Sequence, residues 1–163
     1  MANSAVRVER GFEYERILVP VSGDSTDREA IKLACSLARS ARRSGCKLLV
    51  LYVVQVRRSL PLDAHIEAET QKAEQTLGWA ENVASAECDC DVETDLLQAR
   101  DVGVAIVDEA MEREADLIVM GAGYKKRFGV PAVSPTALTV LRDAPCHVVI
   151  IRPRQVGADV EGK

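Results

Sequence analysis

Short apolar runs alternate with amphipathic stretches along most of the chain. The runs 16–21 and 47–54 are continuous and rich in β-branched residues, and they are too short to be buried helices. Because apolar and polar positions do not alternate within them, they are typical of strands covered on both faces in a parallel sheet. The runs 115–120 and 147–152 have the same character, and the more polar run 91–98 indicates a strand at the sheet edge.

The first amphipathic stretch carries signals for both ends of a helix. Its apolar residues, at positions 30, 33, 34, 37, 38 and 41, recur with helical spacing. Glu29 follows Thr26 at the distance of a capping box, which predicts the helix start. Ser44 and Gly45 are typical residues for its end.

Three further helices are predicted, over 63–86, 102–114 and 136–142. Residues 57–63 form a linker before the first of them, and a loop of about a dozen residues precedes the last. The alternation of strands and helices indicates a doubly wound α/β fold, with a five-stranded parallel sheet and helices on both faces. Ligands bind such sheets beyond the carboxyl ends of the strands, so the loops 22–27 and 121–135 are the places to inspect.

Composition narrows the class of protein. A chain of 163 residues with 47% hydrophobic and 28% charged residues is long enough for one independent core. A net charge of −4 and only 4% aromatic residues disfavour nucleic acid and acidic membrane surfaces as partners. We expect no membrane insertion and no secretion signal in residues 1–10. Five cysteines, an odd number, favour a reducing, cytoplasmic compartment.

Catalytic and metal-binding side chains are few. His65 and His147 have no spaced partner, and the sequence contains no metalloprotease motif, nucleophile elbow or P-loop, so structural histidines are favoured. Cys88 and Cys90 could bind a soft metal or form a redox pair. Because a zinc site needs a second pair of ligands, incidental thiols are the favoured interpretation.

The loop after the fourth strand contains the candidate anion site. Gly121-Ala-Gly123 follows a strand but lacks the third glycine of a dinucleotide fingerprint, so we expect no nicotinamide cofactor. Lys125-Lys126-Arg127 is either solvated surface charge or part of a site for phosphate or another anion. Ser134 and Thr136, at the start of the next helix, could add hydroxyl and backbone donors.

Several stretches together resemble the universal stress protein family. ILVPVSGDSTDREAIKLACSLAR is similar to its opening strand, turn and alanine-rich helix, and ADLIVMGAG with VLRDAPCHVVIIRP is similar to its closing half. The resemblance covers residues 13–153, which leaves 1–12 as an N-terminal extension and 154–163 as a flexible tail. It is especially close to UspA-like domains attached to amino-acid transporters, through LYVVQVRRSLPLDA and LQARDVGVAIVDEA. It implies strand order 3-2-1-4-5 and a homodimer through the last strand, 147–152.

The resemblance also implies an altered nucleotide site. Members that bind ATP carry an aspartate after the first strand and a Gly-x2-Gly-x9-Gly-Ser/Thr signature after the fourth. Ser22 replaces the aspartate, and the signature maps onto Gly121, Tyr124, Ser134 and Pro135, so only its first glycine is kept. Tyr124 adds a side chain where the backbone should approach phosphate, and Pro135 removes a hydroxyl and an N–H donor.

Three functions remain open. The first is a regulatory or sensing protein, not an enzyme, that binds ATP or AMP (with Mg if ATP binds), with the base near Val21 and Val53 and the phosphates near 121–136. The second is a weak ATPase, because Ser22-Gly-Asp-Ser25 faintly resembles the pyrophosphate loop of ATP pyrophosphatases. The third is a protein partner of a membrane transporter that binds no nucleotide. The candidate nucleotide-binding residues are Pro20, Val21, Ser22, Val53, Met120, Gly121, Gly123, Tyr124, Lys125, Arg127, Ser134 and Thr136; no catalytic or metal-binding residue is assigned.

Overall fold

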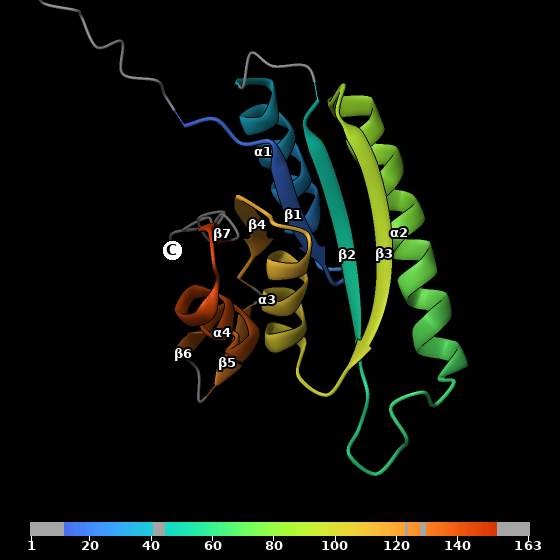
Figure 1. Ribbon diagram of the computed structural model, residues 1–163. Helices are drawn as coiled ribbons and strands as arrows, with labels where there is room; N and C mark the ends of the chain where they lie inside the picture. The colour runs from blue at the N-terminus through green and yellow to red at the C-terminus, as the bar shows by residue number, and fades with distance from the viewer. Residues whose placement is uncertain (1–11, 41–44, 123, 128–129, 153–163) are drawn as a thin grey trace, which may run out of the picture.

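A five-stranded parallel sheet forms the centre of the molecule (Figure 1). The computed structural model describes residues 12–40, 45–122, 124–127 and 130–152, and for 39–40, 124–127 and 130–131 it describes the backbone alone. The strands are β1 (Arg16–Val21), β2 (Lys47–Gln55), β3 (Asp91–Ala99), β4 (Leu117–Gly121) and β7 (His147–Ile151). Their order is β3-β2-β1-β4-β7, and every neighbouring pair is parallel. This confirms the predicted fold class, with β3 at one edge.

Helices cover both faces of the sheet (Figure 1). They are α1 (Asp27–Ser40), α2 (Glu67–Glu87), α3 (Val102–Glu112) and α4 (Pro135–Asp143). Alternate residues of β1 enter two separate cores: Ile17 and Val19 pack with α1 and α2, and Leu18 packs with α3 and α4. Since both faces are covered, β1 needs no polar side, which explains its continuous apolar run.

The second helix starts four residues later than predicted, at Glu67 instead of Asp63. Residues before it form a turn, in which the Ala64 N–H donates to the Pro61 carbonyl at 3.0 Å. The Gln98 side chain of β3 donates to the Ala64 carbonyl at 3.1 Å and holds this turn against the sheet. Residues 63–66, Asp-Ala-His-Ile, are compatible with a helix or a turn, so the tertiary contact decides.

The loop predicted after the fourth strand contains an antiparallel hairpin of β5 (Tyr124–Arg127) and β6 (Val130–Val133). Its strands are short, one is strongly polar and the other contains Pro131, so the period-two signal of a hairpin is absent. The third helix ends at Glu112, two residues before the predicted end. Glu114 has a φ of 51°, and this left-handed conformation does not continue a helix.

Some predictions fall on other parts of the chain. Residues 1–11 of the extension, Ser44 at the predicted end of the first helix, and the tail 154–163 lie outside the described residues. Within the described ranges, none of the helices combines the length and apolar character needed to span a bilayer.

Candidate functional site

A cavity of about 510 Å³ opens at the carboxyl edge of the sheet. It lies between the ends of β1 and β4, where the chain crosses to opposite faces: β1 leads into α1 on one face, and the connection after β4 leads to α4 on the other. This crossover point is the usual ligand site of doubly wound sheets. Eight of the candidate residues line the cavity: Pro20, Val21, Ser22, Val53, Met120, Gly121, Ser134 and Thr136.

The other four candidates have no described position in the cavity. Gly123 lies outside the described residues, and Tyr124, Lys125 and Arg127 belong to β5, of which only the backbone is described. Their proximity to a ligand stays a prediction.

Further residues line the cavity that were not among the candidates. They are Asp24, Thr26, Asp27, Leu51, Tyr52, Gln55, Asp101, Val102, Ile106, Pro135 and Thr139. Leu51, Tyr52 and Gln55 belong to β2, and Asp101 follows β3; the carboxyl ends of both strands meet at the same edge as those of β1 and β4. The carboxyl ends of all the strands, and not only the two loops beside the crossover, are the signal that points to Gln55 and Asp101. Neither histidine of the chain, His65 or His147, lines the cavity.

The Asp27 carboxylate accepts hydrogen bonds from the backbone of the loop between β1 and α1. Its Oδ2 accepts the backbone N–H groups of Ser22 at 3.1 Å, Gly23 at 2.8 Å and Asp24 at 3.1 Å. Gly23 has a φ of 84°, a conformation that turns consecutive amides toward one point. Such converging amides bind phosphate in other loops. Here the protein's own carboxylate holds them.

Burial raises the pKa of the Asp27 carboxyl above its usual range. The hydrogen bonds from Gly23 and Ser22 lower the pKa but only partly offset the burial, and the nearby charge of Asp24 raises it further. Burial therefore makes the charge of the Asp27 carboxylate costly, and the three amide hydrogen bonds offset part of that cost.

The side chain of the neighbouring Thr26, unlike that of Asp27, has no hydrogen-bond partner. Its side chain is 3% exposed, and its Oγ1 is the one buried side-chain oxygen or nitrogen in the described chain without a hydrogen-bond partner. The capping box predicted for Thr26 and Glu29 needs a hydrogen bond to the Thr26 hydroxyl, and that part of the prediction is wrong. The reason is packing: Thr26 lies on Gly121, where an added Cβ would be 2.0 Å from Oγ1. Only glycine at position 121 of β4 leaves room for this contact with Thr26, the residue before α1.

The described wall of the cavity is acidic. It contains the carboxylates of Asp24, Asp27 and Asp101, and none of the described side chains that line it is basic. At the start of α4, the Ser134 Oγ accepts the Ala137 N–H at 3.2 Å and Pro135 has no N–H. This helix start thus offers a phosphate fewer amides than an ordinary helix N-terminus.

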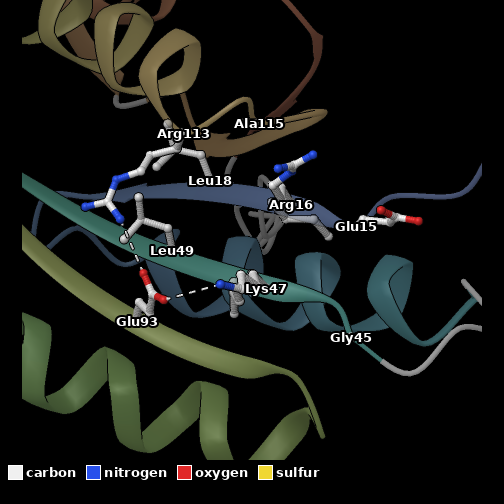
Figure 2. A pocket seen from close by; sticks show the side chains of 11 residues that line it. Glu15, Arg16, Leu18, Gly45, Lys47, Leu49, Glu93, Arg113 and Ala115 are labelled. Carbon is white, nitrogen blue, oxygen red and sulfur yellow. Dashed lines mark hydrogen bonds and ion pairs between the residues drawn. The ribbon is translucent and has the colours of Figure 1, made fainter.

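A second cavity, of about 370 Å³, lies at the amino edge of the sheet on the side of α3 (Figure 2). Figure 2 shows Glu93 between Lys47 and Arg113, at 4.0 Å and 3.4 Å. Arg113 also pairs with Asp95 at 3.0 Å and with Glu109 at 2.8 Å, and the Glu109 hydrogen bond is the main cause of its raised pKa. Because these charges pair with one another, the first cavity is the better candidate for a ligand.

A doubly wound parallel sheet with helices on both faces places the chain among the α/β proteins of Rossmann-like fold. Residues 13–152 match the family model described as the Universal stress protein family. The chain therefore belongs to the universal stress protein family.

Individual relatives agree in length and fold. A relative from Staphylococcus aureus (strain USA300) that bears the universal stress protein name is 29% identical over 155 residues, 91% of this chain and 90% of the relative. The chain resembles the solved structure of universal stress protein UspA from Lactobacillus plantarum, with a TM-score of 0.71, 25% identity and coverage of 87% and 100%. It shares its fold with the universal stress protein from Archaeoglobus fulgidus in complex with dAMP, with a TM-score of 0.65, 24% identity and coverage of 86% and 99%.

Proposed function

We propose that this protein is a regulatory or sensing member of its family that binds an adenine nucleoside monophosphate in the cavity at the carboxyl edge. The observation that carries the proposal is the cavity itself, which lies at the crossover point and brings eight of the candidate residues together. Its volume of about 510 Å³ is in the range of small-molecule sites. The complex of the Archaeoglobus fulgidus protein with dAMP supports the ligand class.

The apolar and polar parts of the wall suggest an orientation for the ligand. Val21, Val53 and Ile106 offer apolar surface for the base. The Ser22 hydroxyl stands where members that bind ATP have an aspartate, so it offers one hydroxyl to the ribose in place of a carboxylate. The Thr136 hydroxyl lies at the start of α4, on the side proposed for the phosphate.

The same wall disfavours a triphosphate. Each added phosphate brings negative charge toward Asp24, Asp27 and Asp101, and like charges in a partly desolvated site repel. The three amides of the β1–α1 loop already donate to Asp27, so they are not available to a phosphate chain. This also counts against ATP hydrolysis through a pyrophosphate-type loop. A single phosphate can stay near Thr136 and solvent.

Thermal-shift titration with adenosine, AMP and ATP with Mg tests the proposal. A ligand at 100 times its dissociation constant adds about 2.7 kcal/mol to the free energy of unfolding. We expect AMP to stabilise the protein at lower concentration than ATP. Val53→Phe, which fills the side proposed for the base, is expected to abolish the shift. Leu138→Phe, at an exposed position of α4 outside the cavity, serves as its control. No shift with any of the three ligands overturns the proposal.

A second candidate function, docking on a membrane transporter from the cytoplasmic side, rests on a different observation. The stretches 51–64 and 97–110, which resemble transporter-attached domains, lie side by side because β2 pairs with β3. The Arg100 guanidinium donates to the carbonyls of Arg57 and, at 2.7 Å, Leu60, and so fixes the loop after β2. Leu60 is 39% exposed and Leu62 is 49% exposed.

Co-purification from membranes that contain a tagged amino-acid transporter tests this candidate. The unmodified chain is expected to co-purify with the transporter, and Leu60→Glu with Leu62→Glu is expected to remove it. Leu141→Glu, at an exposed position of α4, serves as the control. Recovery that is the same for all three chains, or absent for all three, rejects transporter docking through this corner.

A further inference from the structure

Three thiols from distant parts of the sequence lie together at the amino edge of the sheet. Cys46 directly precedes β2, and Cys88 and Cys90 lie between α2 and β3. Cys46 and Cys88 are each 7% exposed, whereas Cys90 is half-buried at the border of the α1–α2 core. The sequence pattern favours Cys88 and Cys90 as incidental thiols, and only the pairing of β2 with β3 adds Cys46 to them.

The pairing of the strands places Cys46 beside Cys90. Lys47 and Asp91 are register partners in the parallel pair, so the residues before them are neighbours too. The Asp91 N–H donates to the Cys46 carbonyl at 3.0 Å, and the thiols of Cys46 and Cys90 are within hydrogen-bond reach of each other. Neighbouring strands lie about 4.8 Å apart. That spacing is within the range of about 4.4–6.8 Å between the Cα atoms of a disulfide.

We propose that Cys46 and Cys90 form a reversible disulfide by exchange with a small-molecule disulfide of the glutathione type. Cys90, the more exposed thiol, reacts first. Its thiolate attacks one sulfur of the small disulfide, which breaks the S–S bond. A mixed disulfide between Cys90 and the small molecule forms, and one small thiol leaves. The Cys46 thiolate then attacks the Cys90 sulfur and releases the second small thiol. Two protein thiols are oxidised to one disulfide, one small disulfide is reduced to two thiols, and the two protons pass to the released thiols.

Cys88 is the competing partner, because its thiol is also within hydrogen-bond reach of the Cys90 thiol. Only Cys46 is joined to the Cys90 segment through the register of β2 and β3 and through the hydrogen bond from the Asp91 N–H to the Cys46 carbonyl. For this reason Cys46 is the partner of Cys90 in the proposed disulfide. A metal is not the alternative, because no group of side chains in the described ranges has the arrangement to hold a metal ion.

The cluster is built for slow exchange. Burial raises the pKa of both Cys90 and Cys46, and the carboxylates of Glu15 and Asp116, together with Cys88, raise the pKa of Cys46 further. Because only the thiolate attacks, the rate should rise about tenfold per pH unit while the pH is below these pKa values. This separates the site from a fast peroxide-sensing cysteine, which needs a lowered pKa.

Incubation of the reduced, folded protein with oxidised glutathione, followed by peptide mass spectrometry without reduction, tests the proposal. We expect a linked pair of peptides that contain Cys46 and Cys90, and a rise of several degrees in melting temperature. Cys88→Ser, the matched control, is expected to keep the link. Cys46→Ser is expected to stop at the glutathione adduct on Cys90, and Cys46→Ala replaces it if the serine variant does not fold.

Three outcomes overturn the proposal. The first is a glutathione adduct on Cys90 without a link in the unmodified chain. The second is a link between Cys88 and Cys90. The third is a link between Cys46 and Cys90 that forms only when denaturant is added, which would assign it to the unfolded chain.

Discussion

Thr26 and Asp27 are adjacent in the sequence, yet one has an unpaired buried hydroxyl and the other accepts three amide hydrogen bonds. A buried polar group without a partner costs about 1–3 kcal/mol of stability. Both residues line the cavity, so this cost lies where a ligand would bind. Because the Thr26 hydroxyl lowers stability at the wall of the cavity, we infer that it forms a hydrogen bond to the ligand.

Replacing Thr26 by the isosteric valine should separate stability from binding. Thr26→Val removes the unpaired hydroxyl, and we expect the free energy of unfolding to rise by about 1 kcal/mol. If a bound ligand turns the hydroxyl toward itself, AMP should bind about threefold to tenfold more weakly, the effect of one neutral hydrogen bond. Urea unfolding and thermal shift with AMP measure the two effects. Thr26→Ser keeps the hydroxyl and is the control. A variant that is less stable and binds AMP normally contradicts the prediction.

Asp27 predicts a pH dependence of stability. Its pKa in the folded protein is raised above the reference value of 3.8, so the folded state binds a proton before the unfolded state does. Its ionised form therefore lowers stability at neutral pH, and this penalty is relieved as the pH falls through the folded pKa toward 3.8. Relative to Asp27→Asn, which has no charge to lose, the unmodified protein should gain stability over that window.

Urea unfolding at several pH values measures this difference, with Asp108→Asn, at an exposed position of α3, as the control. A stability difference between the unmodified protein and Asp27→Asn that stays constant with pH, or that changes in the opposite direction, contradicts the prediction.

At the scale of elements, the sequence predicts what depends on periodicity and misses what depends on contacts. The strands are predicted because buried parallel strands are continuous apolar runs. The turn before Glu67 and the hairpin of β5 and β6 are missed, since a hydrogen bond from Gln98 and a polar strand leave no periodic signal. The position of the cavity follows from topology, whereas the Asp27 hydrogen bonds and the neighbours of Cys46 follow from loop geometry and strand register.

The contact between α3 and α4 gives a prediction at this scale. A Cβ at Gly103 of α3 would lie 2.7 Å from the Thr139 Cβ and 3.2 Å from the Thr136 carbonyl oxygen, so Gly103→Ala must push the helices apart. We expect a loss of about 1–3 kcal/mol of stability and weaker AMP binding, because both threonines line the cavity. Gly78→Ala in α2 is the control, since nothing lies within 4 Å of its added Cβ.

The Gly78→Ala control should raise stability by about 0.5–1 kcal/mol through helix propensity alone. Chemical denaturation of both variants measures the contrast. Equal and favourable effects of the two substitutions would show that the α3–α4 contact is not tight.

At the scale of the whole molecule, β7 forms the edge of the sheet opposite β3. This strand pairs with β4 on one side and is the last strand of the sheet, and its residues Val149 and Ile151 are half-buried. The unpaired backbone groups of an apolar edge strand can form hydrogen bonds with a strand of another chain. A homodimer through 147–152 therefore remains our prediction, with the two copies related by a two-fold axis.

Val149→Lys or Ile151→Lys should weaken this dimer or make the protein insoluble, because a lysine at a half-buried edge position would be desolvated on pairing. Val104→Lys, at an exposed position of α3, is the control and should leave the mass in solution unchanged. Light scattering measures both. A monomer for the unmodified chain rules the dimer out.

The loop held by Asp27 also bears on how the proposed ligand would bind. A binding loop that is loose before its ligand arrives must be ordered on each encounter, which lowers affinity and slows capture. Here three internal hydrogen bonds preorganise the loop. This part of the cavity wall is thus already ordered, so the nucleotide proposed as ligand would not have to order it on binding.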